Sequence, residues 1–229
     1  MADPQVQRDW TGSDGYTLLR QTLTFARLLE KNWLLLQGRP LSNQRILDFG
    51  CGWGRIVRVL YYFSDPANLY GCDPWTRSID ICKADGIVAN LALSDYLPRS
   101  LPFSQQSFDL IVAFSVFTHL SERATAVALG TLAQHLAPDG LLMITIRPVE
   151  YWDIHAGLSA DEVKSLKTKH ASEGFAFRPH SRAAVEGDIT YGDTSISPSY
   201  LAAKFPELKL RKIERSLDDP YQLALFFSK

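Results

Sequence analysis

The chain has 229 residues, 46% of them hydrophobic, and a formal net charge of −1 from 24 Lys and Arg against 25 Asp and Glu. This length predicts one large domain, or one domain with an insertion. The near-zero charge argues against nucleic acid or an anionic membrane as a partner bound through bulk charge. No uncharged apolar stretch is long enough to span a bilayer, and residues 1–5 lack the features of a secretory signal.

The first 40 residues are predicted to form an N-terminal helical cap. Residues 1–15 are polar and contain glycine, whereas residues 16–36 carry leucines and aromatic side chains at helical spacing. Gly38 and Pro40 are typical of a helix end, so we expect the helix to stop there.

Between residues 41 and 148, short apolar runs alternate with helical segments. Strands are expected at 45–49, 68–72, 87–93, 108–114 and 141–146, and helices at 55–63, 77–84 and 122–136. Such alternation is typical of βαβ units and a parallel sheet. Continuous apolar strands also indicate a sheet that is covered on both faces.

The alternation stops after Pro148. Residues 149–197 are mixed and rich in aromatic side chains, and then a short helix is expected from Ser199 and two strands at 208–213 and 221–227. A turn between these strands predicts a hairpin at the sheet edge. The predicted fold is therefore α/β: an open, mostly parallel, seven-stranded Rossmann-like sheet with an antiparallel C-terminal hairpin. Helices cover both faces, and an insertion follows the fifth strand.

A glycine loop between the first predicted strand and the next helix is the most informative segment. Gly50, Gly52 and Gly54 lie there, and such glycines let the backbone approach a ligand at a helix N-terminus. Asp73 follows the next strand, where an acid accepts hydrogen bonds from ribose hydroxyls. The alternatives are a tight turn without a ligand and a helix-capping aspartate.

Two cofactor classes use this layout. Nicotinamide and flavin enzymes need a third glycine where this chain has Arg55. Asp48 would lie unfavourably beside a pyrophosphate, but it suits the positive amino group and sulfonium of S-adenosylmethionine. The loop therefore favours S-adenosyl-L-methionine, and a nicotinamide-dependent reductase is the alternative.

With these features the chain resembles a class I S-adenosylmethionine-dependent methyltransferase. The resemblance covers residues 41–148 and rests on four motifs in order, at 47–55, 71–74, 101–111 and 136–140. Together with the residue pattern, it predicts a cap at 1–40 and a methyltransferase domain at 41–229, with 149–197 as a substrate-side insertion or lid.

The resemblance also implies roles for single residues. Asp48 would organise the loop or reach the cofactor's amino group, directly or through water. Asp73 would hold the ribose and Asp95 would meet the adenine, although Asp95 could instead be a solvated loop acid. The other residues expected at the cofactor are Gly50, Cys51, Gly52, Trp53, Pro74, Tyr96, Phe114 and Ser115. Cys51 is expected to pack rather than act as a nucleophile, and Trp53 could shield the cofactor or pack the helix.

Methyl transfer from a sulfonium is an in-line displacement, so positioning can supply much of the catalysis without a base. His119 follows the fourth strand on the ligand-binding side and is the candidate catalytic residue; a structural histidine is the alternative. Segment 149–197 either folds around its own aromatic core or supplies an acceptor wall. The residues expected in that wall are Tyr151, Trp152, His155, His180 and Tyr191.

Segment 149–197 has eight acids against five bases, which disfavours a polyanionic acceptor. Residues 191–195 and 219–222 resemble methyltransferases of the small-molecule or glycan-associated type, which modify sugars and surface glycans. The favoured function is therefore O-methylation of a sugar or another small hydroxylated metabolite. A non-catalytic binding module is a further alternative. Three cysteines predict reduced thiols in a cytoplasmic protein. The spacing of Cys and His residues predicts no metal site, and a homodimer is left open.

Overall fold

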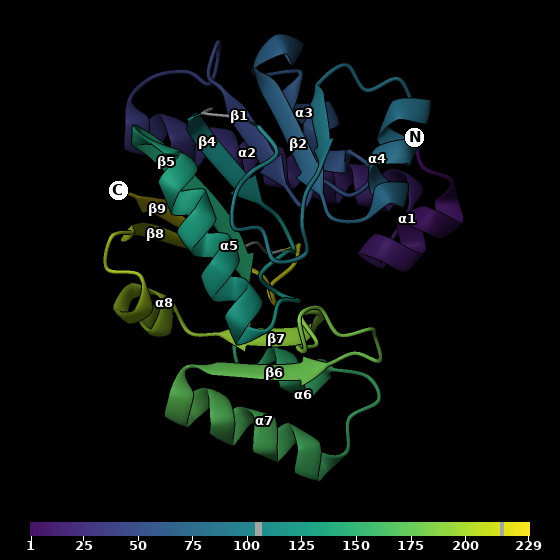
Figure 1. Ribbon diagram of the computed structural model, residues 1–229, viewed down its shortest axis with the longest axis vertical. Helices are drawn as coiled ribbons and strands as arrows, with labels where there is room; N and C mark the ends of the chain where they lie inside the picture. Colours follow the sequence, from purple (N-terminus) through teal and green to yellow (C-terminus); the bar gives the residue numbers. More distant parts are fainter. Residues whose placement is uncertain (104–106, 216–217) are drawn as a thin grey trace.

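A seven-stranded sheet forms the middle of a three-layer α/β structure (Figure 1). The computed structural model describes residues 1–103, 107–215 and 218–229. The strands lie in the order β3-β2-β1-β4-β5-β9-β8. Their bounds are β1 (Ile46–Phe49), β2 (Leu69–Asp73), β3 (Asn90–Leu93), β4 (Phe108–Ala113), β5 (Leu136–Ile146), β8 (Lys209–Arg215) and β9 (Leu223–Ser228).

Strands β1 to β5 run parallel to one another, whereas β9 is antiparallel to both of its neighbours, β5 and β8. The last two strands therefore form a hairpin at one edge of the sheet. This arrangement confirms the predicted open, mostly parallel Rossmann-like sheet with an antiparallel C-terminal hairpin.

Helices cover both faces of the sheet. Successive strand residues point to opposite sides, so the apolar strands present side chains for helices to pack against on each face. Ile46 of β1 packs with Leu29 and Trp33 of the long N-terminal helix, and Leu47 packs in the opposite core with Leu132. No helix within the described ranges is both long and apolar enough to cross a membrane. The helices are α1 (Pro4–Thr11), α2 (Gly15–Gln37), α3 (Arg55–Leu60), α4 (Thr76–Ala84), α5 (Glu122–His135), α6 (Tyr151–Ile154), α7 (Ala160–Glu173) and α8 (Pro198–Lys204).

The polar N-terminal segment contains a helix, α1, that the sequence pattern did not indicate. Asp3 caps it, because its carboxylate accepts hydrogen bonds from the backbone N–H groups of Gln5 and Val6 at 2.9 and 3.1 Å. Gly12 ends it in the left-handed region, at a φ of 76°. Val6 is buried against Trp53 next to the glycine loop, so α1 is anchored close to the predicted cofactor site.

Strand β5 begins earlier than expected. Helix α5 ends at His135, and Leu136 already pairs with Phe108 of β4. The register then shifts between Phe108 and Leu110, so the expected helix stop at 138–140 is an irregular start of the strand. A side chain at Gly140 would approach the Phe108 carbonyl oxygen to 2.9 Å, which explains the glycine.

Segment 149–197 lies beyond the carboxyl ends of the parallel strands (Figure 1). It contains α6, α7 and a two-stranded antiparallel sheet, β6 (Phe175–Pro179) and β7 (Gly192–Ile196). The backbone N–H groups of Gly192 and Thr194 donate to the carbonyls of His119 and Thr118 at 2.8 and 2.9 Å. These bonds hold β7 against the loop that follows β4.

Candidate cofactor and acceptor site

A cavity of about 690 Å³ opens at the carboxyl end of the parallel strands. Its walls come from the loops after β1, β2 and β4, from α1 and from segment 149–197. In open α/β sheets, ligands bind where the strand order reverses, which in this sheet is between β1 and β4. The volume is typical of a small-molecule site.

The loop after β1 is a tight turn that presents backbone to this cavity. Gly50, Gly52 and Gly54 have φ values of 75°, 54° and 81°, in the left-handed region that favours glycine. The N–H groups of Gly50 and Cys51 donate to the Cys72 carbonyl of β2 at 2.8 and 3.0 Å. The turn is therefore fixed to β2 before any ligand binds.

Asp73, at the end of β2, holds the glycine loop to the start of α4. Its two carboxylate oxygens accept hydrogen bonds from the backbone N–H groups of Gly52 and Trp75, at 3.0 and 2.9 Å. Burial raises the pKa of Asp73 above its ordinary value, although the bonds from Trp75, Ser78 and Gly52 oppose the shift. Because an ionised carboxylate can accept about four hydrogen bonds, both oxygens can still accept ribose hydroxyls.

Asp48, the third residue of β1, lines the cavity next to the glycine loop. The residue is buried, and its Oδ2 atom has no hydrogen-bond partner among the described residues. Burial raises the pKa of Asp48 to about 7, and the positive charge of Arg55 opposes the shift. A buried carboxylate oxygen without a partner is costly, so this position suits a cationic ligand group.

These features fit S-adenosylmethionine, which supplies an electrophilic methyl group on a sulfonium. Asp48 would bind the amino group, and Asp73 would bind the ribose hydroxyls. Tyr96 lines the cavity, whereas the neighbouring Asp95, expected at the adenine, is exposed and is not among the lining residues. The lining also includes other residues expected at the cofactor: Gly50, Cys51, Gly52, Trp53, Pro74, Phe114 and Ser115.

Two tryptophans that the sequence did not single out form another wall. Trp10 of α1 stacks on Trp75, which precedes α4, with ring centroids 4.7 Å apart. The Arg77 guanidinium lies over both rings, at 6.0 and 5.6 Å from their centroids. All three residues line the cavity. No sequence signal joins Trp10 to Trp75, because helix α1 was not predicted.

The end of β4 carries a strained residue at the cavity. Ser115 has a φ of 60°, which is uncommon for a residue other than glycine. Its backbone N–H donates to the Thr145 Oγ1 atom of β5 at 2.7 Å. Such outliers persist where the surroundings fix them and cluster at functional sites, so the strain supports a functional role for this loop.

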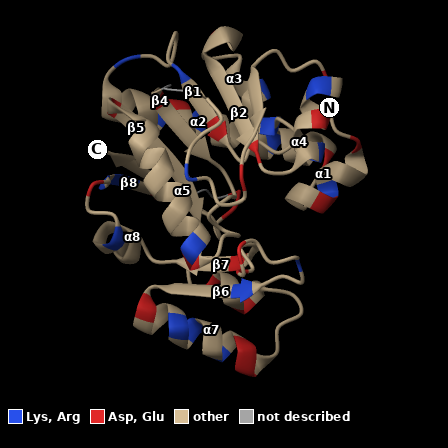
Figure 2. Cartoon of the chain, viewed as in Figure 1, with Lys and Arg blue, Asp and Glu red and all other residues tan. Residues whose placement is uncertain are grey.

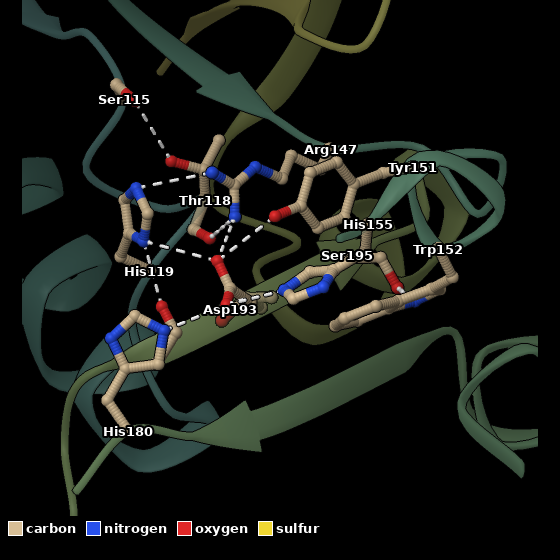
Figure 3. Close-up of polar contacts among 12 residues, drawn as sticks. Ser115, Thr118, His119, Arg147, Tyr151, Trp152, His155, His180, Asp193 and Ser195 are labelled. Atoms are coloured by element: carbon tan, nitrogen blue, oxygen red, sulfur yellow. Dashed lines mark hydrogen bonds and ion pairs between the residues drawn. The ribbon is translucent and has the colours of Figure 1, made fainter. Parts of the chain in front are cut away.

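Asp193 of β7 is the centre of a second polar cluster (Figure 3). Its Oδ1 atom accepts hydrogen bonds from Arg147 and Tyr151 at 2.7 and 3.1 Å, and its Oδ2 atom accepts from His155 and His180 at 3.0 and 2.8 Å. Burial favours the neutral acid, but these donors hold the pKa of Asp193 well below its ordinary value. The carboxylate is therefore ionised.

His119, the expected catalytic residue, lines the cavity but has little free hydrogen-bonding capacity. Its Nδ1 atom donates to the Gly192 carbonyl at 2.8 Å, and its Nε2 atom lies 3.4 Å from an Arg147 nitrogen. Burial and the Arg147 charge lower the pKa of His119 to about 4. The neutral ring stacks on Tyr191, with centroids 5.0 Å apart.

The residues expected to contact the acceptor divide into two groups. The structure brings His180 and Tyr191 to the cavity. It places Tyr151, Trp152 and His155 in or next to α6, on the far side of Asp193, where they pack inside segment 149–197 (Figure 3). Trp152 is fully buried and donates to the Ser195 Oγ atom at 2.7 Å.

Asp73→Ala is expected to weaken S-adenosylmethionine binding by roughly 10- to 150-fold, because a hydrogen bond to a charged group contributes about 1.5–3 kcal/mol. The matched control is Asp80→Ala, which removes an exposed carboxylate from α4. Isothermal titration calorimetry with S-adenosylmethionine measures both affinities. Equal affinities of Asp73→Ala and wild type would remove Asp73 from the site.

Comparison with known proteins supports a methyltransferase domain in this chain. The family described as "Methyltransferase domain" matches residues 47–144. The chain is 30% identical over 137 residues to "Probable tRNA methyltransferase 9B" of Bos taurus, covering 57% of this chain and 28% of that protein. It is 31% identical over 105 residues to "Ubiquinone biosynthesis O-methyltransferase" of Methylobacterium sp., covering 44% of this chain and 40% of that protein. The chain thus spans less than half the length of either relative.

Solved structures share the fold across nearly the whole chain. A TehB-like SAM-dependent methyltransferase from Corynebacterium glutamicum has a TM-score of 0.55 at 22% identity and covers 97% of this chain and 92% of its own. Magnesium protoporphyrin IX methyltransferase from Synechocystis, with bound SAH, has a TM-score of 0.56 at 14% identity and covers 99% and 100%. Residues 47–144 thus match the methyltransferase domain family, and these solved structures, at 22% and 14% identity, share the fold of the chain.

Proposed function

We propose that the protein transfers the methyl group of S-adenosylmethionine to a hydroxyl group of a small molecule, a sugar or another hydroxylated metabolite. One observation carries the proposal. The cavity that holds Asp48 and Asp73 continues to His180 and Tyr191 of segment 149–197. The residues expected at the cofactor and a polar, aromatic wall therefore share one cavity of small-molecule size.

The charge distribution supports a small acceptor over a nucleic acid. Figure 2 shows acidic and basic residues interspersed over the molecule, including α7, rather than one basic face. Nucleic-acid binding draws on clustered Lys and Arg residues. The tRNA methyltransferase relatives match 57% of this chain or less.

We assign supporting roles on the same basis. Segment 149–197 acts as the lid over the acceptor, and residues 1–40 act as the cap whose Trp10 reaches the cofactor cavity. His119 positions the acceptor by contact and by stacking on Tyr191. Cys51, Cys72 and Cys82 are unpaired, which fits a protein of the reducing cytoplasm.

Release of S-adenosylhomocysteine in an acceptor screen tests this proposal. The panel contains methyl glycosides, phenol, 4-nitrophenol, primary amines, carboxylates and unmodified tRNA. We expect turnover with hydroxyl compounds, and its loss in Asp73→Ala. Turnover confined to amines or to tRNA would contradict the proposal. Cofactor binding without turnover on any acceptor would favour a binding module.

A further inference from the structure

We propose that His180, oriented by Asp193, is the general base that takes the proton from the acceptor hydroxyl. The proposal rests on the proposed function, since it names the residue that activates the hydroxyl. His180 lies directly after β6 and lines the cavity. Asp193 lies opposite, on β7 (Figure 3).

The hydrogen bond between the two side chains fixes the protons on the imidazole. His180 Nε2 lies 2.8 Å from Asp193 Oδ2. An ionised carboxylate can only accept, so Nε2 carries the hydrogen, and the neutral form of the ring has its lone pair on Nδ1. Nδ1 points away from Asp193 (Figure 3), and the described part of the chain provides no hydrogen-bond partner for it. A base that can receive a proton is therefore present at the cavity wall.

Access distinguishes His180 from the two other histidines around Asp193. The side chain of His180 is 36% exposed, against 18% for His119 and 11% for His155. Both ring nitrogens of His119 face protein groups, the Gly192 carbonyl and Arg147. The free nitrogen of His155 is buried. Only the lone pair of His180, among these three rings, is open to a ligand in the cavity.

Other charged and titratable groups around His180 do not take this role. Tyr191, 5.6 Å from the His180 ring, has its pKa raised by burial and stays protonated. Arg147 and Arg182 carry positive charge, with Arg182 over the Tyr191 ring at 4.1 Å. The Nδ1 hydrogen of His119 is donated to the Gly192 carbonyl, so this nitrogen cannot take a proton from the acceptor. Asp193 itself is ionised, and its four hydrogen-bond donors fix its position. It can therefore stabilise a charged His180 without moving.

The proposed step conserves atoms and charge. The acceptor oxygen forms a bond to the methyl carbon as the carbon–sulfur bond breaks, and the bonding pair passes to sulfur. The hydroxyl proton moves to His180 Nδ1. The resulting imidazolium is held by the Asp193 carboxylate, as in other Asp–His pairs where the acid orients the ring and stabilises its charge. The proton leaves to water after the product is released.

Acceptors of different acidity separate a base from a merely structural histidine. Phenol and methyl α-D-glucopyranoside keep their proton at pH 8.5, whereas 4-nitrophenol is largely ionised in solution. We expect His180→Gln to lower kcat about 10²- to 10⁴-fold on the two protonated acceptors, and less than about tenfold on 4-nitrophenol. Asp193→Asn is expected to show the same ordering. The matched control is His135→Gln at the end of α5, outside the cavity, and it should behave as wild type.

A second measurement does not depend on the acceptor. Diethyl pyrocarbonate reacts with an unprotonated imidazole nitrogen, so peptide mapping after brief treatment of the S-adenosylhomocysteine complex at pH 7 reports open lone pairs. We expect His180 to react before His119 and His155. Faster modification of His119 or His155 would overturn the assignment.

The outcomes separate the two proposals. An equal fall of kcat on all hydroxyl acceptors in His180→Gln, or no fall, would overturn His180 as the base while methyl transfer stands. If the wild type binds S-adenosylhomocysteine but methylates no hydroxyl compound, the proposed function fails instead. Calorimetry with S-adenosylhomocysteine verifies that each variant still binds the cofactor product.

Discussion

Cofactor-free Asp48→Asn is expected to gain stability over the wild type as the pH rises from about 4 to 7. The folded protein raises the pKa of Asp48 from 3.8 to about 7 through burial. An acid with a raised pKa stabilises the fold below its unfolded value and loses that contribution as the pH rises through the folded value. At about 1.4 kcal/mol per pKa unit, the wild type loses at most roughly 4 kcal/mol, and the amide avoids this loss.

The net stability of Asp48→Asn over the wild type at pH 8 will be smaller than this limit, because the new amide has its own hydrogen-bonding needs, which cost about 1–3 kcal/mol at every pH when unmet. Urea unfolding at pH 4, 6 and 8 measures the difference between the two proteins. Asp80→Asn, an exposed change on α4, is the control. A difference between Asp48→Asn and wild type that stays constant from pH 4 to 8 would contradict the expected burial of charge.

The same substitution should weaken S-adenosylmethionine binding by roughly 30-fold or more, because truncating one partner of a buried charge pair costs about 2–5 kcal/mol. Wild-type affinity should also rise from pH 5.5 to 7, as Asp48 ionises, whereas Asp48→Asn should lack that rise. Calorimetry at both pH values measures it. The expected role of Asp48 in cofactor binding therefore explains why the protein buries a carboxylate that destabilises its cofactor-free form.

Most residues expected at the cofactor line one cavity, because this side of the cavity is built locally. Gly50 and Gly52 follow β1 directly, and Asp73 follows β2, so the order of strands and loops alone brings them together. Parallel strands place their carboxyl ends at one edge, whatever the details of side-chain packing. The fold could be predicted for the same reason, since each strand and each helix carries its own pattern.

The acceptor side could not be predicted to the same degree because it depends on contacts between distant segments. Asp193 becomes the centre of a polar cluster only when β7 lies beside Arg147, which is 46 residues earlier in the sequence. The aromatic composition of segment 149–197 did not indicate which rings face inward. Trp152 and His155 face the core of the segment itself, whereas His180 faces the cavity. Helix α6 and the pairing of β6 with β7 determine these orientations.

Asp193 also explains how segment 149–197 is held against the end of the sheet. Arg147 leaves β5, and its side chain reaches both Asp193 and the Thr118 carbonyl, at 2.7 and 3.0 Å. His155 and His180 approach the same carboxylate from the other side. One charged group therefore ties the end of β5 and the loop after β4 to segment 149–197, and a change in either part would move His180.

Gly54→Ala is expected to destabilise the protein by about 2–5 kcal/mol, through a backbone cost and a packing cost. Its φ of 81° costs an alanine roughly 1–2 kcal/mol. The new Cβ would also collide with Ile87 and lie 3.0 Å from Cys82 Sγ, and overpacking a core costs about 1–3 kcal/mol. Urea or thermal unfolding of the cofactor-free protein measures the loss.

Two other glycines separate the backbone cost from the packing cost. Gly86 has a φ of 68° and nothing within 4 Å of an added Cβ, so Gly86→Ala should cost only the backbone share of roughly 1–2 kcal/mol. Gly130 lies within α5 with open space around it, and Gly130→Ala should stabilise by about 0.5–1 kcal/mol. If Gly54→Ala costs no more than Gly86→Ala, the Ile87 side chain moves aside freely. The small core of Ile87, Cys82 and Val57 beneath the loop then does not hold the glycine turn in place.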